Sequence, residues 1–475
     1  MKLRFSVLLL AFTIGGSFNT SAQVLVSSQV IDTSAANFLN FFANGRAQFD
    51  VVTYKIKYRT TDLDSSTTTA SGAVSVPIGG SCDSLSLALY AHGTVLEDDN
   101  VPSRGNFESN IGKVFASTGH IAVMPDYLGL GDHPGLHPYV HAESEATTSL
   151  DAMRAARELL DTMPLQNEVL LTGYSQGGHA AMATAKYIKD QNLQSTFNLI
   201  ATAGLSGPYD LSGLQVQNIV RDQPYQTPGY VVYLIMAMEE VYGNIYQQPS
   251  DFLQAPYDSI IPPYFDGTFP IDSVHAQLPL RASQFLDSTF FQNFIQDSVA
   301  QSSPLWLALQ LNSNAQWVPQ HALRMYYCTS DEQVNFKNAL TAESYMQNNG
   351  APNVDAQKVG SGNHGDCVIP AVTAASSFFD SLSTSCNRSV DLPEPTALQA
   401  AEIFPNPAHD ELHLKNLPAQ QECAYHLYDS RGAIQMEGIA KENQTLELST
   451  LPAGIYFLLV RDEEGGALRR RISIR

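Results

Sequence analysis

The chain has 475 residues, of which 44% are hydrophobic and 15% charged, a balance typical of globular proteins rather than disordered ones. Asp and Glu number 47 against 26 Lys and Arg, which gives a formal net charge of −21. Such a surface repels nucleic acid and anionic membranes, so the composition argues against both as partners.

The first 22 residues have the pattern of a secretory signal peptide. Lys2 and Arg4 precede a mainly apolar stretch over residues 5–14, and small residues end at Ala22. The apolar stretch is too short to cross a hydrocarbon core of about 30 Å, and no later segment is long and apolar enough to do so. We therefore expect export, cleavage after Ala22 and no transmembrane segment.

Export would place the five cysteines in an oxidising compartment. Cys423 belongs to a predicted C-terminal module. Four cysteines belong to the main domain: Cys82, Cys328, Cys367 and Cys386. Four cysteines allow three pairings, among which the sequence does not choose, and the absence of close C-x-x-C pairs argues against structural zinc.

Between residues 85 and 208 the chain alternates apolar runs with helical stretches. Apolar runs predict strands at residues 85–94, 120–131, 167–175 and 197–208, and helices are predicted at 149–161 and 177–190. Continuous apolar strands alternating with helices predict a parallel sheet that is covered on both faces. This order places Ser175 at the carboxyl end of a central strand, where a helix begins.

Ser175 lies between Gly173 and Gly177 in the stretch "GYSQGG". The G-x-S-x-G pattern alone is weak, because at roughly 7% usage for Gly and Ser a chain of this length contains it by chance about once in six. The position of the pattern between a strand and a helix makes a catalytic serine a stronger prediction. A sharp strand-to-helix turn lifts the hydroxyl above the sheet, and side chains at the two glycine positions would collide with their neighbours. The alternative is an ordinary glycine-rich turn.

With this motif the chain resembles the α/β-hydrolase superfamily, most closely its secreted lipases and esterases, over residues 45 to 385. The resemblance implies a mostly parallel central sheet with helices on both faces and an inserted helical cap. It also implies a nucleophilic serine followed along the chain by the acid and then the base, each on a loop after a later strand.

Two downstream loops supply candidates for these partners. An apolar strand at residues 323–328 is followed by a polar turn with Asp331, the expected acid, which would orient an imidazole; Glu332 and Asp355 are its competitors. A further short strand leads to a glycine-rich loop with His364, the expected general base. A structural role for this loop histidine is the alternative.

The oxyanion hole requires two backbone N–H groups. One is expected from Gln176, the residue after the serine. The other is expected from Thr94, with Gly93 as its neighbour, because "AHGT" resembles the superfamily's His-Gly motif.

Three histidines and one aspartate near the predicted site are expected to have structural roles. His133, His137 and His141 are four residues apart, as metal ligands on a helix would be, but Pro134 and Pro138 spoil a regular helix there, so a histidine-rich loop is favoured. Asp126, in "PDYLGLG", is expected to buttress the site and not to take part in catalysis.

More than a hundred residues separate the strand at 197–205 from that at 323–328, far beyond the usual two to six. We expect an inserted cap at about 208–318. Its aromatic residues include Tyr230, Tyr233, Tyr242, Phe252, Tyr257, Phe265, Phe269, Phe285, Phe290, Phe291, Phe294 and Trp306. An aromatic cap over a serine suits apolar acyl chains, although any single ring is expected to belong to the core of the cap itself.

After Cys386 the sequence changes to a polar, proline-containing linker at 386–401 and then to alternating apolar residues with frequent turns, which predict a small all-β sandwich at 402–475. The signatures at residues 404–407, 428–432 and 451–456, with basic residues at 469–471, resemble the C-terminal sorting domain of type IX secretion. The resemblance implies the type IX secretion machinery as a partner, and release from the cell or retention at its surface. A substrate-binding β-module is the alternative.

Together these observations predict a signal peptide at 1–22, an α/β-hydrolase domain at 23–385 and a sorting domain. The hydrolase would cleave carboxylic esters, including lipid esters, without a cofactor, using Ser175, His364 and Asp331. A serine exopeptidase on the same fold and a non-catalytic surface binding protein are the alternatives. Exopeptidases of this kind usually carry a long, repeat-built N-terminal domain, for which the sequence leaves no room.

Overall fold

The computed structural model describes residues 23–78, 84–383, 398, 401–418, 422–430, 432–462 and 467–475. The predicted signal peptide at 1–22 lies outside these residues. So does the predicted linker, apart from Leu398 and Ala401.

A nine-stranded mixed sheet forms the centre of the main domain, in the order β1-β2-β3-β5-β4-β6-β7-β8-β9. Its strands are β1 (Leu25–Ser34), β2 (Asp50–Thr61), β3 (Thr67–Ile78), β4 (Leu85–Ala91), β5 (Ile121–Pro125), β6 (Leu165–Tyr174), β7 (Asn198–Leu205), β8 (Ala322–Cys328) and β9 (Val354–Gly360). Strands β5, β4, β6, β7, β8 and β9 run parallel, while β1, β2 and β3 add an antiparallel edge. The elements predicted between residues 85 and 208 are all present.

Helices cover both faces of this sheet, as predicted. On one face lie α3 (Ala142–Leu159), α4 (Gln176–Asp190) and α11 (Lys337–Asn348), and on the other lie α1 (Ala36–Leu39), α2 (Phe107–Ser117) and α12 (Val368–Leu382). Each face has its own apolar core, with Met153 and Leu171 buried on the first and Phe115 and Phe379 on the second. Burial on both faces explains why the parallel strands read as continuous apolar runs.

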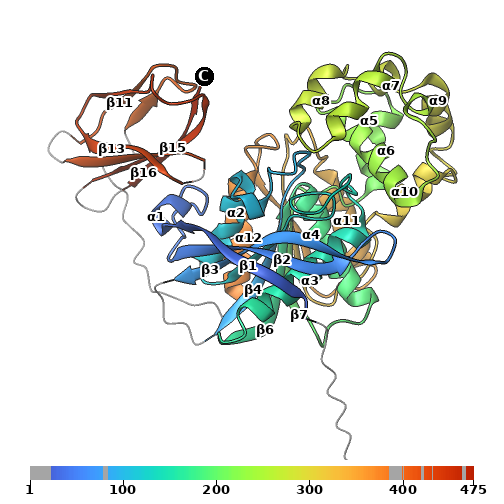
Figure 1. Cartoon of the computed structure of the whole chain (residues 1–475), viewed down its shortest axis with the longest axis horizontal. Coiled ribbons are helices and arrows are strands. Elements are labelled where there is room, and N and C mark those ends of the chain that lie inside the picture. The colour runs from blue at the N-terminus through green and yellow to red at the C-terminus, as the bar shows by residue number, and fades with distance from the viewer. Residues whose placement is uncertain are drawn as a thin grey trace, which may run out of the picture.

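Between β7 and β8 the chain forms a helical cap, consisting of α5 (Gln217–Val220), α6 (Gly229–Tyr242), α7 (Tyr257–Ile260), α8 (Ile271–Gln277), α9 (Ser288–Gln296) and α10 (Pro304–Leu311) (Figure 1). The cap has a separate core, in which Trp306 and Phe252 are fully buried and the Trp306 ring stacks on Phe294 at 4.5 Å. Many of its aromatic rings therefore stabilise the cap itself.

The C-terminal residues form two small antiparallel sheets. One contains β10 (Glu402–Phe404), β11 (Glu411–Lys415) and β14 (Gln444–Glu447), and the other β12 (Cys423–Tyr428), β13 (Ile434–Ala440), β15 (Gly454–Arg461) and β16 (Ala467–Ile474). Leu412 of the first sheet and Leu458 of the second belong to one buried core, so the predicted sandwich is confirmed.

This sandwich contacts the main domain next to α1, away from the cap (Figure 1). The ring of Phe457 lies 4.9 Å from that of Phe42 and 6.0 Å from that of Phe38, and the ring of Tyr428 lies 5.3 Å from that of Phe38. An aromatic cluster, which the sequence analysis did not anticipate, therefore joins the two parts of the chain.

Candidate active site

Ser175 occupies a strained turn between β6 and α4. Its φ of 58° and ψ of −119° lie in a region that L-residues rarely adopt, and its N–H donates to the Leu205 carbonyl at 2.8 Å. The flanking glycines are a steric necessity: a Cβ on Gly177 would lie 1.8 Å from the Ala91 carbonyl oxygen, and one on Gly173 would lie 2.3 Å from that of Gly177. The turn is thus the tight strand-to-helix connection that the motif predicts.

The loop after β4 lies directly beside this turn. A Cβ built on Gly93 would lie 3.8 Å from Ser175 Cβ, and the Thr94 hydroxyl donates to Tyr139 Oη at 3.2 Å. The serine is also followed at once by the N-terminus of α4, whose dipole favours negative charge. The two segments expected to form an oxyanion hole therefore flank the serine.

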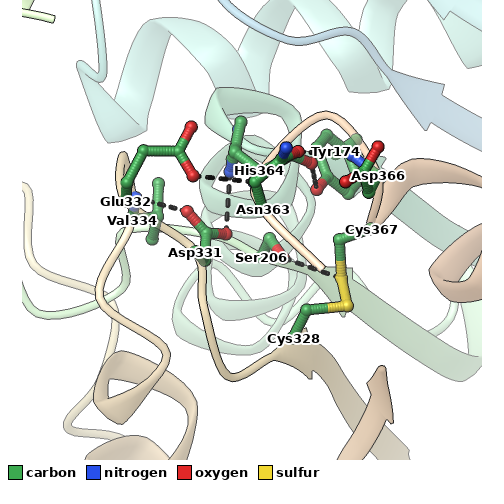
Figure 2. The surroundings of a disulfide bond; sticks show 10 residues. All are labelled: Tyr174, Ser206, Cys328, Asp331, Glu332, Val334, Asn363, His364, Asp366 and Cys367. Atoms are coloured by element: carbon green, nitrogen blue, oxygen red, sulfur yellow. Dashed lines mark hydrogen bonds and ion pairs between the residues drawn. A yellow bond between two sulfur atoms is a disulfide. The ribbon is translucent and has the colours of Figure 1, made fainter. Parts of the chain in front are cut away.

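His364 is held by three groups from different parts of the chain. Its Nδ1 atom lies 2.8 Å from Asp331 Oδ2, its backbone N–H donates to Glu332 Oε2 at 3.1 Å, and its carbonyl accepts from the Tyr174 hydroxyl. Figure 2 shows these contacts around the loop. Because a carboxylate only accepts, Nδ1 carries the proton and Nε2 is left as the basic nitrogen.

The three candidate acids have distinct environments. The Asp331 side chain is 1% exposed, and its other oxygen accepts the backbone N–H groups of Gln333 at 3.1 Å and Val334 at 2.8 Å. Glu332 binds only the backbone of the histidine. Asp355 is 44% exposed and lies 4.0 Å from Arg324 on the neighbouring strand. Only Asp331 orients the imidazole ring.

Among the described residues, Ser175 Oγ forms no hydrogen bond with His364. The histidine ring instead lies 5.0 Å from the ring of Tyr174, which directly precedes the serine. The hydrogen bond between a nucleophile and its general base is often long or absent without substrate and shortens only in the complex that reacts.

A disulfide joins the ends of the two partner loops. Cys328, the last residue of β8, is bonded to Cys367, which precedes α12, and their Cα atoms are 5.8 Å apart (Figure 2). The sequence left this pairing open, although each cysteine lies three positions from a predicted site residue. Cys82 and Cys386 lie outside the described residues, and Cys423 is buried in the sandwich.

The three spaced histidines have separate structural contacts. His133 Nδ1 accepts the Gly129 N–H at 2.9 Å, His137 Nδ1 lies 2.8 Å from the Leu128 carbonyl, and His141 caps the N-terminus of α3. Burial lowers the pKa of His137 to about 3 and that of His141 to about 4, so both rings are neutral. No cluster of metal-ligating residues occurs in the described part of the chain.

Asp126 has the buttressing role expected of it. Its two carboxylate oxygens accept from the Ser71 hydroxyl at 2.6 Å and from the Ser103 N–H at 3.0 Å. This aspartate is fully buried and ties β3 and the segment before α2 to the end of β5.

A mostly apolar cavity opens from Ser175 into the cap. It encloses about 640 Å³, part of it open to solvent. Its walls include Leu211, Val216, Ile219, Tyr230, Val231 and Leu234 from the cap side and Tyr139 and Val334 from the loops below. A cavity of this size and polarity suits an apolar chain attached to the group that the serine attacks.

Several solved structures resemble this chain. The ligand-bound form of the rice cell wall degrading esterase LipA from Xanthomonas oryzae is 29% identical, with a TM-score of 0.68 over 76% of this chain and 98% of the esterase. Lipase A from Candida antarctica in its closed state is 16% identical, with a TM-score of 0.58 over 79% of this chain and 88% of the lipase, and supports the fold alone. The main domain has the α/β-hydrolase fold.

No curated protein matches the chain. The family model for the secretion system C-terminal sorting domain matches residues 402–475. The α/β-hydrolase fold is therefore followed by a sorting domain, which identifies the chain as a secreted or cell-surface protein. No helix in the described residues has the length and apolar character needed to span a membrane.

Two residues around the serine, Glu145 and Tyr174, had no predicted role. The side chain of Gln176 contacts Glu145 and His137, and Tyr174 and Glu332 hold the histidine loop. Glu145 had a detectable signal, because it is an acidic residue on a face of α3 whose other buried side chains are mostly small, and this helix packs against the helix after the serine.

Proposed function

We propose that this α/β hydrolase is a serine esterase that cleaves carboxylic esters with apolar acyl chains through an acyl-enzyme. The observation that best supports this proposal is the 2.8 Å contact between Asp331 and His364 Nδ1. The loops that bear these residues lie beside a serine that is held in a strained strand-to-helix turn. The resemblance to an esterase supports the same reaction class.

In this mechanism Ser175 Oγ attacks the acyl carbon while its proton passes to His364 Nε2. The carboxylate of Asp331 stabilises the imidazolium that forms. The N–H groups of Gln176 and Thr94 stabilise the tetrahedral oxyanion, aided by the N-terminal end of α4.

Collapse of the tetrahedral intermediate breaks the ester C–O bond, and His364 returns the proton to the departing alcohol. Water then attacks the acyl-enzyme while His364 takes one of its protons; the bond between the acyl carbon and Ser175 Oγ breaks, His364 returns that proton to Oγ, and the carboxylic acid leaves. Every proton in this cycle is carried by the chain's own residues.

The cap cavity is proposed to hold the acyl chain. Its position next to Ser175 and its apolar lining would exclude water from the chain while the carbonyl stays at the serine.

The route of export is a second part of the proposal. The signal peptide at 1–22 would direct the chain across the inner membrane, and the sorting domain at 402–475 would engage the type IX secretion machinery. The hydrolase at 23–385, with its cap at about 208–318, would act outside the cell or at its surface.

The substrate class is tested by hydrolysis of p-nitrophenyl esters of rising acyl length beside aminoacyl-nitroanilides. We expect activity on the esters that is lost in Ser175→Ala. Activity on the anilides alone would identify an exopeptidase, and activity on neither, without labelling of the serine, would indicate a binding protein.

A further inference from the structure

The residue after the nucleophile is anchored by its side chain in a fully buried network. Gln176 is 1% exposed, and its Nε2 atom lies 2.9 Å from Glu145 Oε1 and 2.7 Å from His137 Nε2. Both acceptors are well defined, since Glu145 offers only oxygens and His137 donates through its other nitrogen to Leu128. Gln176 Oε1 has no hydrogen-bond partner among the described residues, so Nε2 alone anchors the side chain.

The carboxylate in this network is balanced by a buried cation. His179 Nδ1 lies 2.7 Å from Glu145 Oε2 and donates to this carboxylate. His179 Nε2 lies 2.7 Å from the Asn312 carbonyl and 3.0 Å from Asn314 Nδ2. Burial lowers the pKa of His179, but the charge of Glu145 outweighs this and leaves the pKa raised. Glu145 and His179 are both fully buried and form a carboxylate–imidazolium pair directly behind the serine.

This pair is also joined to the cap. Asn312 directly follows α10, its Oδ1 accepts the Ala142 N–H at the start of α3 at 2.8 Å, and its Nδ2 donates to Tyr242 Oη at 2.9 Å. One residue thus connects the last cap helix, the end of α6 and the helix that bears Glu145.

The backbone at the serine makes such an anchor necessary. Ser175 has a positive φ, a conformation that persists only when the surroundings hold it in place. The peptide that follows carries the N–H of Gln176, which the proposed mechanism places in the oxyanion hole. A residue fixed at both its backbone and its side-chain end has little freedom to rotate that N–H away.

We propose that Glu145 is a positioning residue, which orients the oxyanion-hole N–H of Gln176 by holding its side chain, and that Asn312 ties this support to the cap. The inference rests on the proposed esterase function. Glu145 acts only through Gln176, whereas His179 neutralises Glu145 and links it to the cap.

The test is the full-length Glu145→Leu variant, which keeps much of the side-chain volume but removes both oxygens, so that Gln176 Nε2 loses this acceptor. We expect kcat on a p-nitrophenyl ester to fall by about 10- to 100-fold with little change in KM, less than the loss of a whole oxyanion-hole donor, because the N–H itself remains. The inhibition constant of a trifluoromethyl ketone, whose adduct carries the oxyanion, should rise by the same factor as kcat/KM falls.

Gln176→Ala gives an independent test, because it retains the backbone N–H and leaves the Glu145–His179 pair intact. We expect a similar loss of kcat, and no additional loss when both substitutions are combined. Asp32→Leu is the matched control, since it likewise removes a carboxylate, here from the ion pair with buried Lys113, and should leave kcat unchanged.

A lowered melting temperature with unchanged kcat and inhibitor affinity in Glu145→Leu would assign Glu145 a structural role only and overturn the inference. If that variant does not fold, unchanged kinetics of Gln176→Ala would overturn it equally. Failure of the esterase proposal itself has a different signature, the absence of ester hydrolysis in the unsubstituted protein.

Discussion

Cys328 and Cys367 form a disulfide. Cys328 lies three residues before Asp331, and Cys367 lies three residues after His364. The bond therefore joins the loop of the proposed acid to the loop of the proposed base, close to the 2.8 Å contact between them. Figure 2 shows the covalent and the polar connection side by side. The relative position of the acid and the base is thus set by a bond that needs an oxidising compartment, in agreement with a secreted protein.

The double variant Cys328→Ala/Cys367→Ala should lose both stability and activity. Closing a loop of 39 residues stabilises a fold by about 2–4 kcal/mol, so the melting temperature should fall. The kcat for esters should fall as well, because the two loops become free to separate. Cys423→Ala, in the sandwich, serves as a control whose kcat should stay unchanged. Equal kcat in the disulfide variant and the parent would show that the bond does not position the acid and the base.

Substitution of the two adjacent acids should separate their roles. In Asp331→Asn the amide can present its N–H₂ to Nδ1 and favour the wrong tautomer, so kcat should fall by about 10,000-fold. In Glu332→Gln an oxygen still accepts the backbone N–H of His364, so the loss should stay below about 10-fold. Steady-state kinetics on one ester measures both. A larger loss for Glu332→Gln would mean that Glu332 is the catalytic acid.

Filling the cap cavity should shift the preferred acyl length. Leu234 lines the cavity on α6, and Leu234→Trp should reduce kcat/KM for long acyl chains by about 10-fold or more while short chains are little affected. Leu307→Trp is the matched control, because Leu307 lies on the same cap and is 47% exposed. A parallel loss for acetyl and dodecanoyl esters would place the acyl chain outside this cavity.

Asp132 should make the stability of the main domain depend on pH in the acid range. Burial raises the pKa of Asp132. Lys55, Lys57 and Arg104, each within 2.8 Å of its carboxylate, lower the pKa by more than burial raises it, so the pKa in the folded protein lies below the usual 3.8. The carboxylate therefore stabilises the fold above about pH 4 and loses this effect as the pH falls.

Urea unfolding of the parent and of Asp132→Asn measures this contribution. The difference in unfolding free energy should be largest at pH 7 and should shrink towards pH 2.5. A difference that grows with acidity would contradict the assigned charge state.

The sequence predicted the parts of the site that depend on local geometry. The glycines around Ser175 are required by carbonyl oxygens within 2.5 Å of where a Cβ would lie, and the positions of Asp331 and His364 follow from the rule that loops after parallel strands meet at one edge. The antiparallel strand β2 was overlooked, although its burial alternates along the chain, as a period-two pattern would predict.

Contacts between distant segments left no comparable local pattern. Glu145 and Gln176 are 31 positions apart, and the Phe42–Phe457 contact joins opposite ends of the chain. The sequence favoured Asp331 over Glu332 but did not predict that both side chains bind His364, one at Nδ1 and the other at the backbone N–H.

The most direct test of the central claim is covalent labelling with a fluorophosphonate followed by peptide mass analysis. Phosphonylation should be found on the peptide that contains Ser175, should be absent in Ser175→Ala and should be strongly slowed in His364→Ala. An enzyme that hydrolyses esters while the label is missing, or is attached to a different serine, would contradict the assignment of Ser175 as the nucleophile.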